Sequence, residues 1–406
     1  MLTVGEALAK VLERSQRLSD SVVPLAESLD HILAENVASD VDSPPHDKSV
    51  VDGYALRSAD VLAGIVEFNV IEEVVAGQVP KLAVDRAQAT RIMTGAPVPR
   101  GADAVVMLER TTLLPAESPS SAAASVQIEP GLVSTGQNIV RRGASIGCGD
   151  LVLHAGRVIR PIEIGVLAEV GRTSVTVIRK PTIAVLATGN ELVPVAETPE
   201  SGHIRNSNGP MLFALGERAG AMPIDLGVGR DDEAHLRELI ECGLGADILV
   251  LSGGVSAGVL DLVPKVLAEL GVEQIFHKVS LKPGKPLWFG IRTHSDRETP
   301  VFGLPGNPVS SLVCFELFVR PTLRRMMGYS DEEPRRRRMP LAIDFEHRGE
   351  RPTYHPSRIV DDRIEPLTWQ GSGDLRTLVE ATALAHFPSG DRAYRAGDAV
   401  EVLLNI

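Results

Sequence analysis

The sequence predicts a multidomain protein that combines α/β and β architecture. Between residues 181 and 327, apolar strand-like runs alternate with helical patterns, which is typical of a doubly wound parallel sheet covered by helices on both faces. Short β-branched runs between 46 and 140, and turn-rich runs after 328, indicate mostly-β domains. A chain of 406 residues also exceeds the size that one hydrophobic core usually serves.

Four domains are expected from changes in these patterns. Two prolines, Pro44 and Pro45, mark the first boundary, and the glycine-rich stretch from 141 to 180 resembles neither of its neighbours. The expected division is a discontinuous elongated N-terminal domain (1–45 and 141–180), a small mostly-β domain (46–140), an α/β domain (181–327) and a C-terminal β domain (328–406). The arginine run 335–338 is interpreted as a solvated linker.

Local signals predict the main elements. Thr3 and Glu6 form a capping-box pattern before an apolar periodic run, which predicts an opening helix. Pro161 in a first turn predicts a helix over 161–170. In the small β domain the expected strand runs are 65–70, 72–75 and 104–108. In the α/β domain the expected strands are 182–187, 222–228, 247–251, 287–290 and 301–304, and the expected helices are 207–219, 231–243, 261–270 and 308–327.

Composition excludes several classes of function. A net charge of −12 and an aromatic content of 4% argue against a nucleic-acid partner. The three cysteines have no disulfide-like or zinc-like spacing, which suits a reducing cytoplasm. No apolar stretch approaches the roughly 18 residues that span a bilayer, so no membrane partner is expected.

The loops that follow the strands of the α/β domain carry the candidate chemistry. Ligands of such folds bind beyond the carboxyl ends of the strands. There the sequence has Thr188-Gly189-Asn190-Glu191, the run 252–258 (Ser-Gly-Gly-Val-Ser-Ala-Gly) and Gly303-Leu304-Pro305-Gly306-Asn307-Pro308. Glycine-rich turns and helix starts offer free N–H groups to anions, although each such turn taken alone is often only a turn.

Lysines and carboxylates add charge to these loops. Lys278 precedes the run Leu281-Lys282-Pro283-Gly284-Lys285-Pro286, and lysine serves as a point charge for phosphate. Asp231 and Asp261 either face the ligand or merely cap the helices that follow them. Carboxylates beside a phosphate repel it unless a divalent cation such as Mg²⁺ lies between them. The residues therefore favour a phosphate site that uses Mg²⁺.

Taken together, the motifs resemble the molybdopterin molybdenumtransferase family, to which the E domain of gephyrin also belongs. The likeness runs from end to end. It rests on Pro44 to Ala55 (Pro-Pro-His-Asp-Lys-Ser-Val-Val-Asp-Gly-Tyr-Ala), on Arg91 to Pro97 with Gly101 to Asp103, on Ser252 to Ser256, and on the lysine and Gly-Leu-Pro-Gly-Asn-Pro loops.

The resemblance implies an enzyme that inserts molybdate into adenylylated molybdopterin and releases AMP with the help of Mg²⁺. It implies an elongated homodimer, with contacts to the upstream adenylyltransferase and to recipient molybdoenzymes as further partners. The implied catalytic residues are Asp52, Thr94, Glu191, Asp231, Asp261, Lys278 and Lys282, of which Glu191, Asp231 and Asp261 would be the metal ligands. The implied substrate-binding residues are Thr188, Gly189, Ser252, Gly253, Gly254, Ser256, Gly258, Pro283, Gly284, Lys285, Pro305, Gly306, Asn307 and Pro308.

Simpler interpretations stay open for some of these residues. Asp52 could belong to an Asp-Gly turn, Thr94 could serve a β-turn, and Lys285 could be a solvated lysine. The sequence also departs from the family pattern at His46, at Ser145 and along 256–260. A catalytically weakened paralogue that carries molybdopterin or its cofactor is therefore the alternative function. The adenylyltransferase is disfavoured, because it normally lacks the flanking domains.

Overall fold

The structure is a computed structural model that describes residues 1–114, 124–254, 262–331 and 335–404. Contacts divide the chain into two compact units, of which the first comprises Met1–Ala34, Gly156–Arg160 and Ser174–Ile406. The second comprises Glu35–Ala155 and Pro161–Thr173. Each unit is described by itself, and the four-domain division stays a prediction. Within the described ranges no helix is long and apolar enough to cross a membrane.

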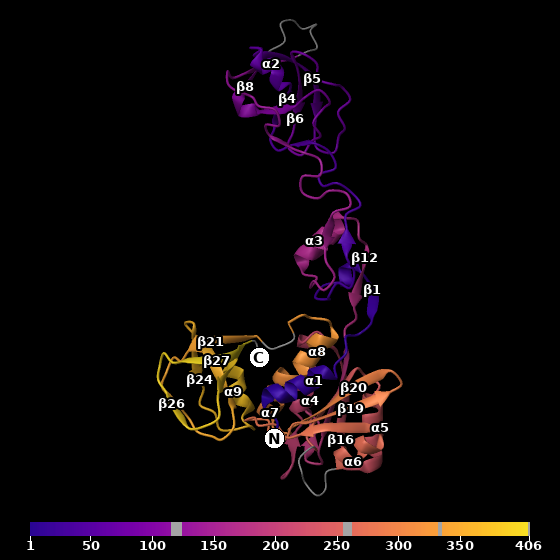
Figure 1. Ribbon diagram of the computed structural model, residues 1–406, viewed down its shortest axis with the longest axis vertical. Helices are drawn as coiled ribbons and strands as arrows, with labels where there is room; N and C mark the ends of the chain where they lie inside the picture. The colour runs from indigo at the N-terminus through magenta and orange to yellow at the C-terminus, as the bar shows by residue number, and fades with distance from the viewer. Residues whose placement is uncertain (115–123, 255–261, 332–334, 405–406) are drawn as a thin grey trace. The chain divides into compact units, whose positions relative to one another are not determined.

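A six-stranded sheet forms the centre of the first unit (Figure 1). In spatial order its strands are β16 (Met222–Gly229), β13 (Thr182–Thr188), β17 (Ile248–Ser252), β20 (Arg297–Leu304), β19 (Trp288–His294) and β18 (Val272–His277). The first four strands pair in parallel, as expected, but β19 and β18 are antiparallel. The predicted parallel pairing therefore holds for the first four strands of the sheet and not for the two at its far edge. A hairpin with Ser295 at φ 54° joins β19 to β20, and so short a connection can link only antiparallel strands.

Helices cover both faces of this sheet, which confirms the doubly wound α/β class. Ile183 and Val185 of β13 face α4 (Asn208–Arg218), whereas Ala184 and Leu186 face α5 (Glu233–Gly243) and α6 (Leu262–Glu269). The alternation follows from the two-residue repeat of a strand, which sends neighbouring side chains to opposite faces. All three helices lie within two residues of their expected bounds.

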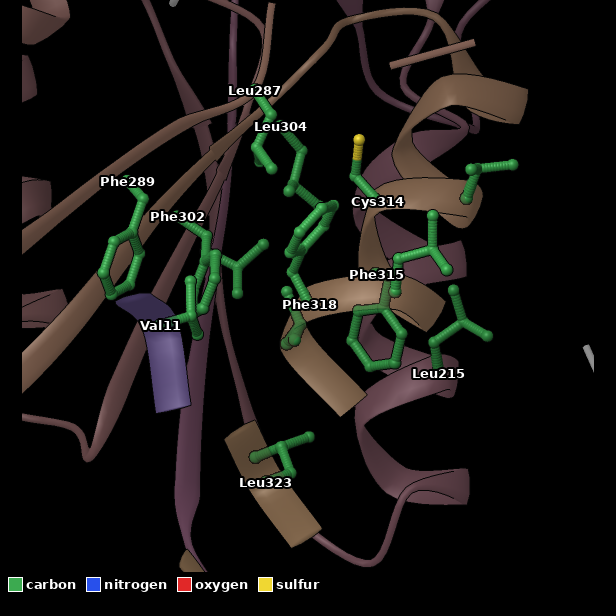
Figure 2. Close-up of a cluster of buried hydrophobic side chains, with 14 of the residues drawn as sticks. Val11, Leu215, Leu287, Phe289, Phe302, Leu304, Cys314, Phe315, Phe318 and Leu323 are labelled. Carbon is green, nitrogen blue, oxygen red and sulfur yellow. The ribbon is translucent and has the colours of Figure 1, made fainter. Parts of the chain in front are cut away.

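The largest apolar cluster lies on the α4 face of the sheet (Figure 2). Phe289 and Phe302 of the sheet pack there with the helical run α7 (Pro308–Cys314), η3 (Phe315–Val319) and α8 (Arg320–Met326). This run confirms the helix expected over 308–327, with a π turn at η3. Pro321 lacks the N–H that would bond residue 317, which accounts for the irregular turn before it.

The N-terminal helix joins the same cluster. α1 (Val4–Glu13) begins with the expected capping box, in which the Glu6 N–H donates to Thr3 Oγ1 and the Thr3 N–H donates to the Glu6 carboxylate. Its buried residues Leu8 and Val11 pack against the sheet and helices. The following strand β1 (Asp20–Pro24) pairs with β12 (Ser174–Ile178). The opening helix is thus part of the α/β core.

The C-terminal part of the first unit is a β domain. Its five-stranded sheet has the order β21 (Arg336–Pro340), β27 (Ala399–Leu404), β25 (Ala383–Phe387), β23 (Thr353–Val360) and β24 (Arg363–Pro366). It also contains the pair β22 (Phe345–His347) and β26 (Arg392–Tyr394), and the short helix α9 (Leu375–Glu380). Tyr354, Leu384 and Leu403 reach into the large apolar cluster, so this domain packs on the α/β core.

The arginine run was wrongly interpreted as a linker. Arg336 to Arg338 belong to the edge strand β21, whose partner is β27. Arg336 pairs with Glu401 and Arg337 with Asp362, so carboxylates of the same domain neutralise these cations. Charged side chains on an edge strand also discourage pairing with other chains, which suits this position in the sheet.

The second unit contains a six-stranded mostly-β sheet. Its order is β7 (Ala104–Met107), β4 (Gly53–Leu56), β6 (Gln88–Ile92), β5 (Glu67–Val74), β9 (Ser125–Ile128) and β8 (Thr111–Leu114). The two runs expected at 65–70 and 72–75 form the single strand β5, which has a register shift between Val70 and Glu72. The unit also holds β3 (Lys48–Ser49) paired with β10 (Ile139–Val140), β2 (Val37–Ala38) paired with β11 (Leu151–Leu153), and the helices α2 (Ser58–Leu62) and α3 (Pro161–Glu169).

Candidate functional site

A pocket of about 280 Å³ lies where β13, β17 and β20 end, and we call it the strand-end pocket. Its position agrees with the rule that open α/β sheets bind ligands beyond the carboxyl ends of their strands. Its lining includes the predicted residues Thr188, Glu191, Ser252, Gly253, Gly306, Asn307 and Pro308, together with Ala187, Leu192, Ile204, Arg205, Asn206, Ser207, Asn208, Gly373 and Leu375. Ser256 and Gly258 lie outside the described residues.

Glycine at the end of β17 is required by the neighbouring strand. Gly253 has φ +89°, and a Cβ there would lie 2.5 Å from the carbonyl oxygen of Thr188. Gly254, at φ +62°, would place a Cβ 2.6 Å from Thr188 Oγ1. The two glycines thus let the turn lie directly against the end of β13, which shapes the floor of the pocket.

The carboxylates of Glu191 and Asp231 stand on adjoining loops. The Asp231 N–H donates to Asn190 Oδ1 at 2.9 Å, which ties the loop after β16 to the loop after β13. The cap of α5 is Asp232, whose carboxylate accepts from the His235 N–H at 2.8 Å. The capping interpretation of Asp231 is therefore wrong, and its side chain is left for another role.

The predicted Mg²⁺ would find two carboxylate ligands on these loops, Glu191 and Asp231. Among the described residues, no three His, Cys, Asp or Glu side chains gather as a metal cluster. Asp261, the third predicted ligand, lies outside those residues. Mg²⁺ commonly takes one or two carboxylates and completes its shell with water and substrate phosphates. Two carboxylates on adjoining loops fit that demand.

A second pocket, of about 450 Å³, surrounds the predicted lysine loop, and we call it the anion pocket. Three cations line it, Lys282, Lys285 and Arg351, with Ser310 and Ser372 as hydroxyl donors. Its other lining residues are Pro283, Gly284, Pro286, Pro305, Asn307, Trp369, Gln370 and Gly371. Positive side chains beside hydroxyl groups are the donors that bind a small oxyanion.

The backbone around Lys282 is fixed from two sides. Its N–H donates to the Pro352 carbonyl at 2.9 Å, and its own carbonyl accepts from the Tyr354 N–H at 2.8 Å, so β23 of the C-terminal domain holds it. On the other side, Gly284 (φ +122°) lies so close to α7 that a Cβ would stand 2.7 Å from Cys314 Sγ. Together these contacts fix the position of the lysine loop between β23 and α7.

Arg351 was not foreseen from the sequence. It comes from the C-terminal domain, and its guanidinium Nη1 donates to the Leu281 carbonyl at 2.7 Å. That bond places the cation beside the lysine loop. No strand-end pattern marks this residue, because it reaches the pocket from a separate sheet.

A segment of the C-terminal domain, residues 369–375, borders both pockets, and we call it the bridging segment. Asn307 Nδ2 donates to Ser372 Oγ at 2.9 Å, and the Val309 N–H donates to the Ser372 carbonyl at 3.1 Å. The N-cap residue of α7, Asn307, makes no side-chain cap of its own. Ser372 thus satisfies one of the free N–H groups at the start of α7.

Lys278 lines neither pocket as the described residues form them. Its backbone has φ 75°, and its N–H donates to the Leu287 carbonyl at 2.8 Å. A left-handed conformation costs a residue with a Cβ about 1–2 kcal/mol, and such strain often accompanies function. The structure places Lys278 near the lysine loop and leaves its catalytic role a prediction.

Replacing Lys278 by glycine is expected to raise the free energy of unfolding by about 1 kcal/mol and to lower enzymatic activity, because strain and the ammonium group disappear together. Urea unfolding and turnover measure the two effects. Ala87→Gly is the matched control, since Ala87 has φ 59° in the second unit. It should gain stability and keep full activity. A Lys278→Gly variant with unchanged turnover would contradict the predicted role.

Asp52 and Thr94 meet in the second unit. The carboxylate Oδ1 of Asp52 accepts from the Thr94 N–H at 2.7 Å and from Thr94 Oγ1 at 2.8 Å. The bond from the Thr94 backbone lowers the pKa of the Asp52 carboxyl. The structure therefore joins two residues that are 42 positions apart in sequence, as an ionised and exposed group. This pairing is compatible with both the turn and the functional interpretation.

The arginines of the Arg141-Arg142-Gly143 motif hold the proline segment of the second unit. Arg141 pairs with Asp47 and Arg142 with Asp42, each at 2.5 Å. The Ser145 N–H donates to the Ser43 carbonyl at 2.9 Å. Ser145, one of the departures from the family pattern, thus sits in a locally bonded turn.

Fold and pockets together define a class: an α/β domain with a pocket at its strand ends and a cation-lined pocket beside it, joined to a C-terminal β domain that contributes to both. Three family models match consecutive parts of the chain. They are "MoeA N-terminal region (domain I and II)" over residues 2–171, "Probable molybdopterin binding domain" over 184–325 and "MoeA C-terminal region (domain IV)" over 338–404. The chain belongs to the MoeA family, which confirms the family resemblance.

Individual relatives agree over nearly the whole length. The molybdopterin molybdenumtransferase of Staphylococcus aureus (strain MRSA252) is 34% identical over 420 residues, which cover 99% of this chain and 95% of that protein. That of Staphylococcus epidermidis (strain ATCC 12228 / FDA PCI 1200) is 35% identical over 415 residues, with the same coverage. A crystal structure of the molybdopterin biosynthesis MoeA protein from Pyrococcus horikoshii has a TM-score of 0.84 at 31% identity, covering 100% of this chain and 99% of that one. The chain is therefore a member of an enzyme family.

Proposed function

We propose that the protein is a molybdopterin molybdenumtransferase that inserts molybdate into adenylylated molybdopterin and releases AMP in a Mg²⁺-dependent reaction. The observation that carries the proposal is that Asn307 borders both the strand-end pocket and the anion pocket. An oxyanion and an organic phosphate could thus be held side by side. The names of relatives at 34% and 35% identity over almost the full chain support a molybdenumtransferase activity.

In this proposal the anion pocket binds molybdate. Molybdate is a tetrahedral dianion, and Lys282, Lys285 and Arg351 supply the charge that compensates it. Arg351 is held by its bond to the Leu281 carbonyl, so its donors are oriented before the ligand arrives. Such preorganised donors lose little entropy on binding, which favours a small anion over solvent.

The strand-end pocket binds the phosphate-bearing part of molybdopterin in this proposal. Glu191 and Asp231 would hold Mg²⁺ beside it, on the loops joined by Asn190. When bound, Mg²⁺ would offset phosphate charge and polarise the pyrophosphate. Ser252 and the turn at Gly253 supply the polar floor on which the ligand rests.

The direct test is release of AMP by the purified full chain with adenylylated molybdopterin, molybdate and Mg²⁺. We expect AMP and active cofactor to form together and both to disappear when Mg²⁺ is chelated. Release of AMP no faster than with heat-killed protein would refute the activity.

The alternative of a weakened carrier is favoured by one observation, the serine at position 145. The Ser145→Asp variant separates the two readings, with Ala144→Asp as the matched control for added charge. Under our proposal Ser145→Asp changes AMP release little. A large gain in Ser145→Asp alone would instead identify a weakened paralogue.

The proposal has three further parts, all of which rest on the resemblance. They are homodimer formation, the use of Asp52 and Thr94 in the same reaction, and contacts with an adenylyltransferase or with recipient molybdoenzymes. Light scattering of the purified chain tests the dimer. Asp52→Ala should lower AMP release far more than it lowers stability, because the Asp52 side chain is exposed and loses only its two bonds from Thr94.

Intrinsic fluorescence should report oxyanion binding, because the chain has only two tryptophans. Trp369 lines the anion pocket, and its indole nitrogen is buried without a partner among the described residues. Trp288 is 2% exposed, donates to Gln274 Oε1 at 2.9 Å and does not line that pocket. Molybdate should therefore change the emission of Trp288→Phe in a saturable way and leave Trp369→Phe unaffected. The reverse pattern would place the oxyanion elsewhere.

A further inference from the structure

Asn208 is a pocket residue that sequence patterns did not single out. It opens α4, is 8% exposed and lines the strand-end pocket. Its Nδ2 donates to Ser252 Oγ at 2.7 Å and to the Gly306 carbonyl at 2.6 Å. A carbonyl oxygen can only accept, so the atom that faces Gly306 must be the amide nitrogen. The orientation of the Asn208 amide is thereby fixed.

This geometry determines what the Ser252 hydroxyl can do. Its oxygen already accepts from Asn208, so its own proton must point in another direction. Ser252 is 2% exposed and lines the strand-end pocket, and within the described part of the chain no acceptor takes that proton. A ligand atom in the pocket is the acceptor that would complete the arrangement.

The oxygen of the Asn208 amide indicates that the residue serves the two bonds that its nitrogen donates. Its Oδ1 is buried without a partner among the described residues. A buried acceptor left unpaired is destabilising, whereas a leucine of similar size would bury no polar atom. An asparagine that destabilises the fold in this way, in the wall of a pocket, indicates a role other than stabilising the fold.

We propose that Asn208 is a positioning residue that turns the Ser252 hydroxyl into a hydrogen-bond donor toward a pterin phosphate bound in the strand-end pocket. The ligand class rests on the proposed function. Asn208 acts through Ser252 and also fixes the loop at Gly306, so three elements that are separate in sequence share one bonding centre. Glu191 and Arg205 are the charged residues that line the same pocket.

A double-mutant cycle tests this inference in the full-length chain. The variants are Asn208→Leu, Ser252→Ala and their combination, and the probe is neopterin monophosphate, whose fluorescence gives a dissociation constant. We expect Asn208→Leu to weaken binding about tenfold when Ser252 is present, the value of one lost hydrogen bond to a charged group. In the Ser252→Ala background the same change should have less than about a twofold effect.

A matched control separates orientation from general damage to the pocket. Asn206 is also 8% exposed and lines the same pocket, but its Oδ1 accepts from the Gly209 N–H at 2.9 Å and it does not bond Ser252. Asn206→Leu should therefore have equal effects in both backgrounds. If Asn208→Leu fails to fold, as judged by its unfolding transition, Asn208→Ala takes its place in the cycle.

Two outcomes would overturn the inference: equal effects of the Asn208 change in both backgrounds, or no binding of the probe by the unchanged chain. AMP release by the unchanged chain is measured separately. Its absence would refute the proposed activity, while the coupling between Asn208 and Ser252 would still decide the positioning role.

Discussion

Replacing Arg351 by alanine is expected to raise the molybdate concentration needed for half-maximal cofactor formation about tenfold to a hundredfold, since one charge-assisted bond contributes roughly 1.5–3 kcal/mol. Arg351 is one of three cations in the anion pocket, and the Leu281 carbonyl orients it. A molybdate titration at saturating adenylylated molybdopterin measures the change. The maximal rate should fall less than the apparent affinity.

Arg348→Ala is the matched control for this prediction. Arg348 lies three residues away in the same domain, pairs with Glu346 at 2.9 Å and has a side chain that is 74% exposed. Its removal changes the net charge equally but leaves both pockets intact. Equal shifts in the two variants would mean that long-range charge, and not the pocket, governs molybdate binding.

The Gly253→Ala variant should lose more than about 3 kcal/mol of unfolding free energy, because two penalties combine. The residue has φ +89°, and the added Cβ would stand 2.5 Å from a backbone oxygen of β13, which cannot move without disturbing the sheet. Any folded fraction should have a misshapen strand-end pocket and weak AMP release. Urea unfolding of the full chain gives the stability change.

Gly271→Ala isolates the penalty of the left-handed backbone. Gly271 also has a left-handed backbone, at φ +79°, but an added Cβ would meet nothing within 4 Å. This control should cost only about 1 kcal/mol, the price of the backbone conformation itself. If both variants lost the same stability, the close approach of the β17 turn to Thr188 would not be a constraint.

The elements that the sequence predicted well are those with local signals. The capping box at Thr3, the helices of the α/β domain and the strands before its glycine loops depend on neighbours within a few residues. β18 was missed because its six residues mix polar and apolar side chains, as an edge strand allows. The arginine strand β21 was missed for a different reason. Its pairing partner β27 lies some sixty residues away, so no neighbouring residue reveals the pairing.

The pockets could be predicted only in part. The strand-end rule led to Ser252, Gly306 and Asn307, which line the strand-end pocket, because those residues lie at or just beyond the ends of strands. Arg351 and the bridging segment could not be found in that way, since they enter from a separate β domain. Asn208 becomes part of the strand-end pocket only once the chain has folded. Nothing in the neighbouring sequence distinguishes it from an ordinary residue at the start of a helix. The catalytic roles of Glu191, Asp231, Lys278 and Lys282 stay predictions.

The contact between Ser372 and the start of α7 limits how far the α/β domain can be separated from the C-terminal β domain. The α/β domain has its own six-stranded sheet, yet one of its helices, α7, is completed by a residue of the β domain. Tyr354, Leu384 and Leu403 of the β domain also fill its apolar cluster. A fragment that ended after α8 would therefore carry an incomplete helix start, a bare hydrophobic face and two open pockets. Recombination could not exchange or delete the β domain without further substitutions in the core that it covers. We therefore expect the two domains to be inherited together.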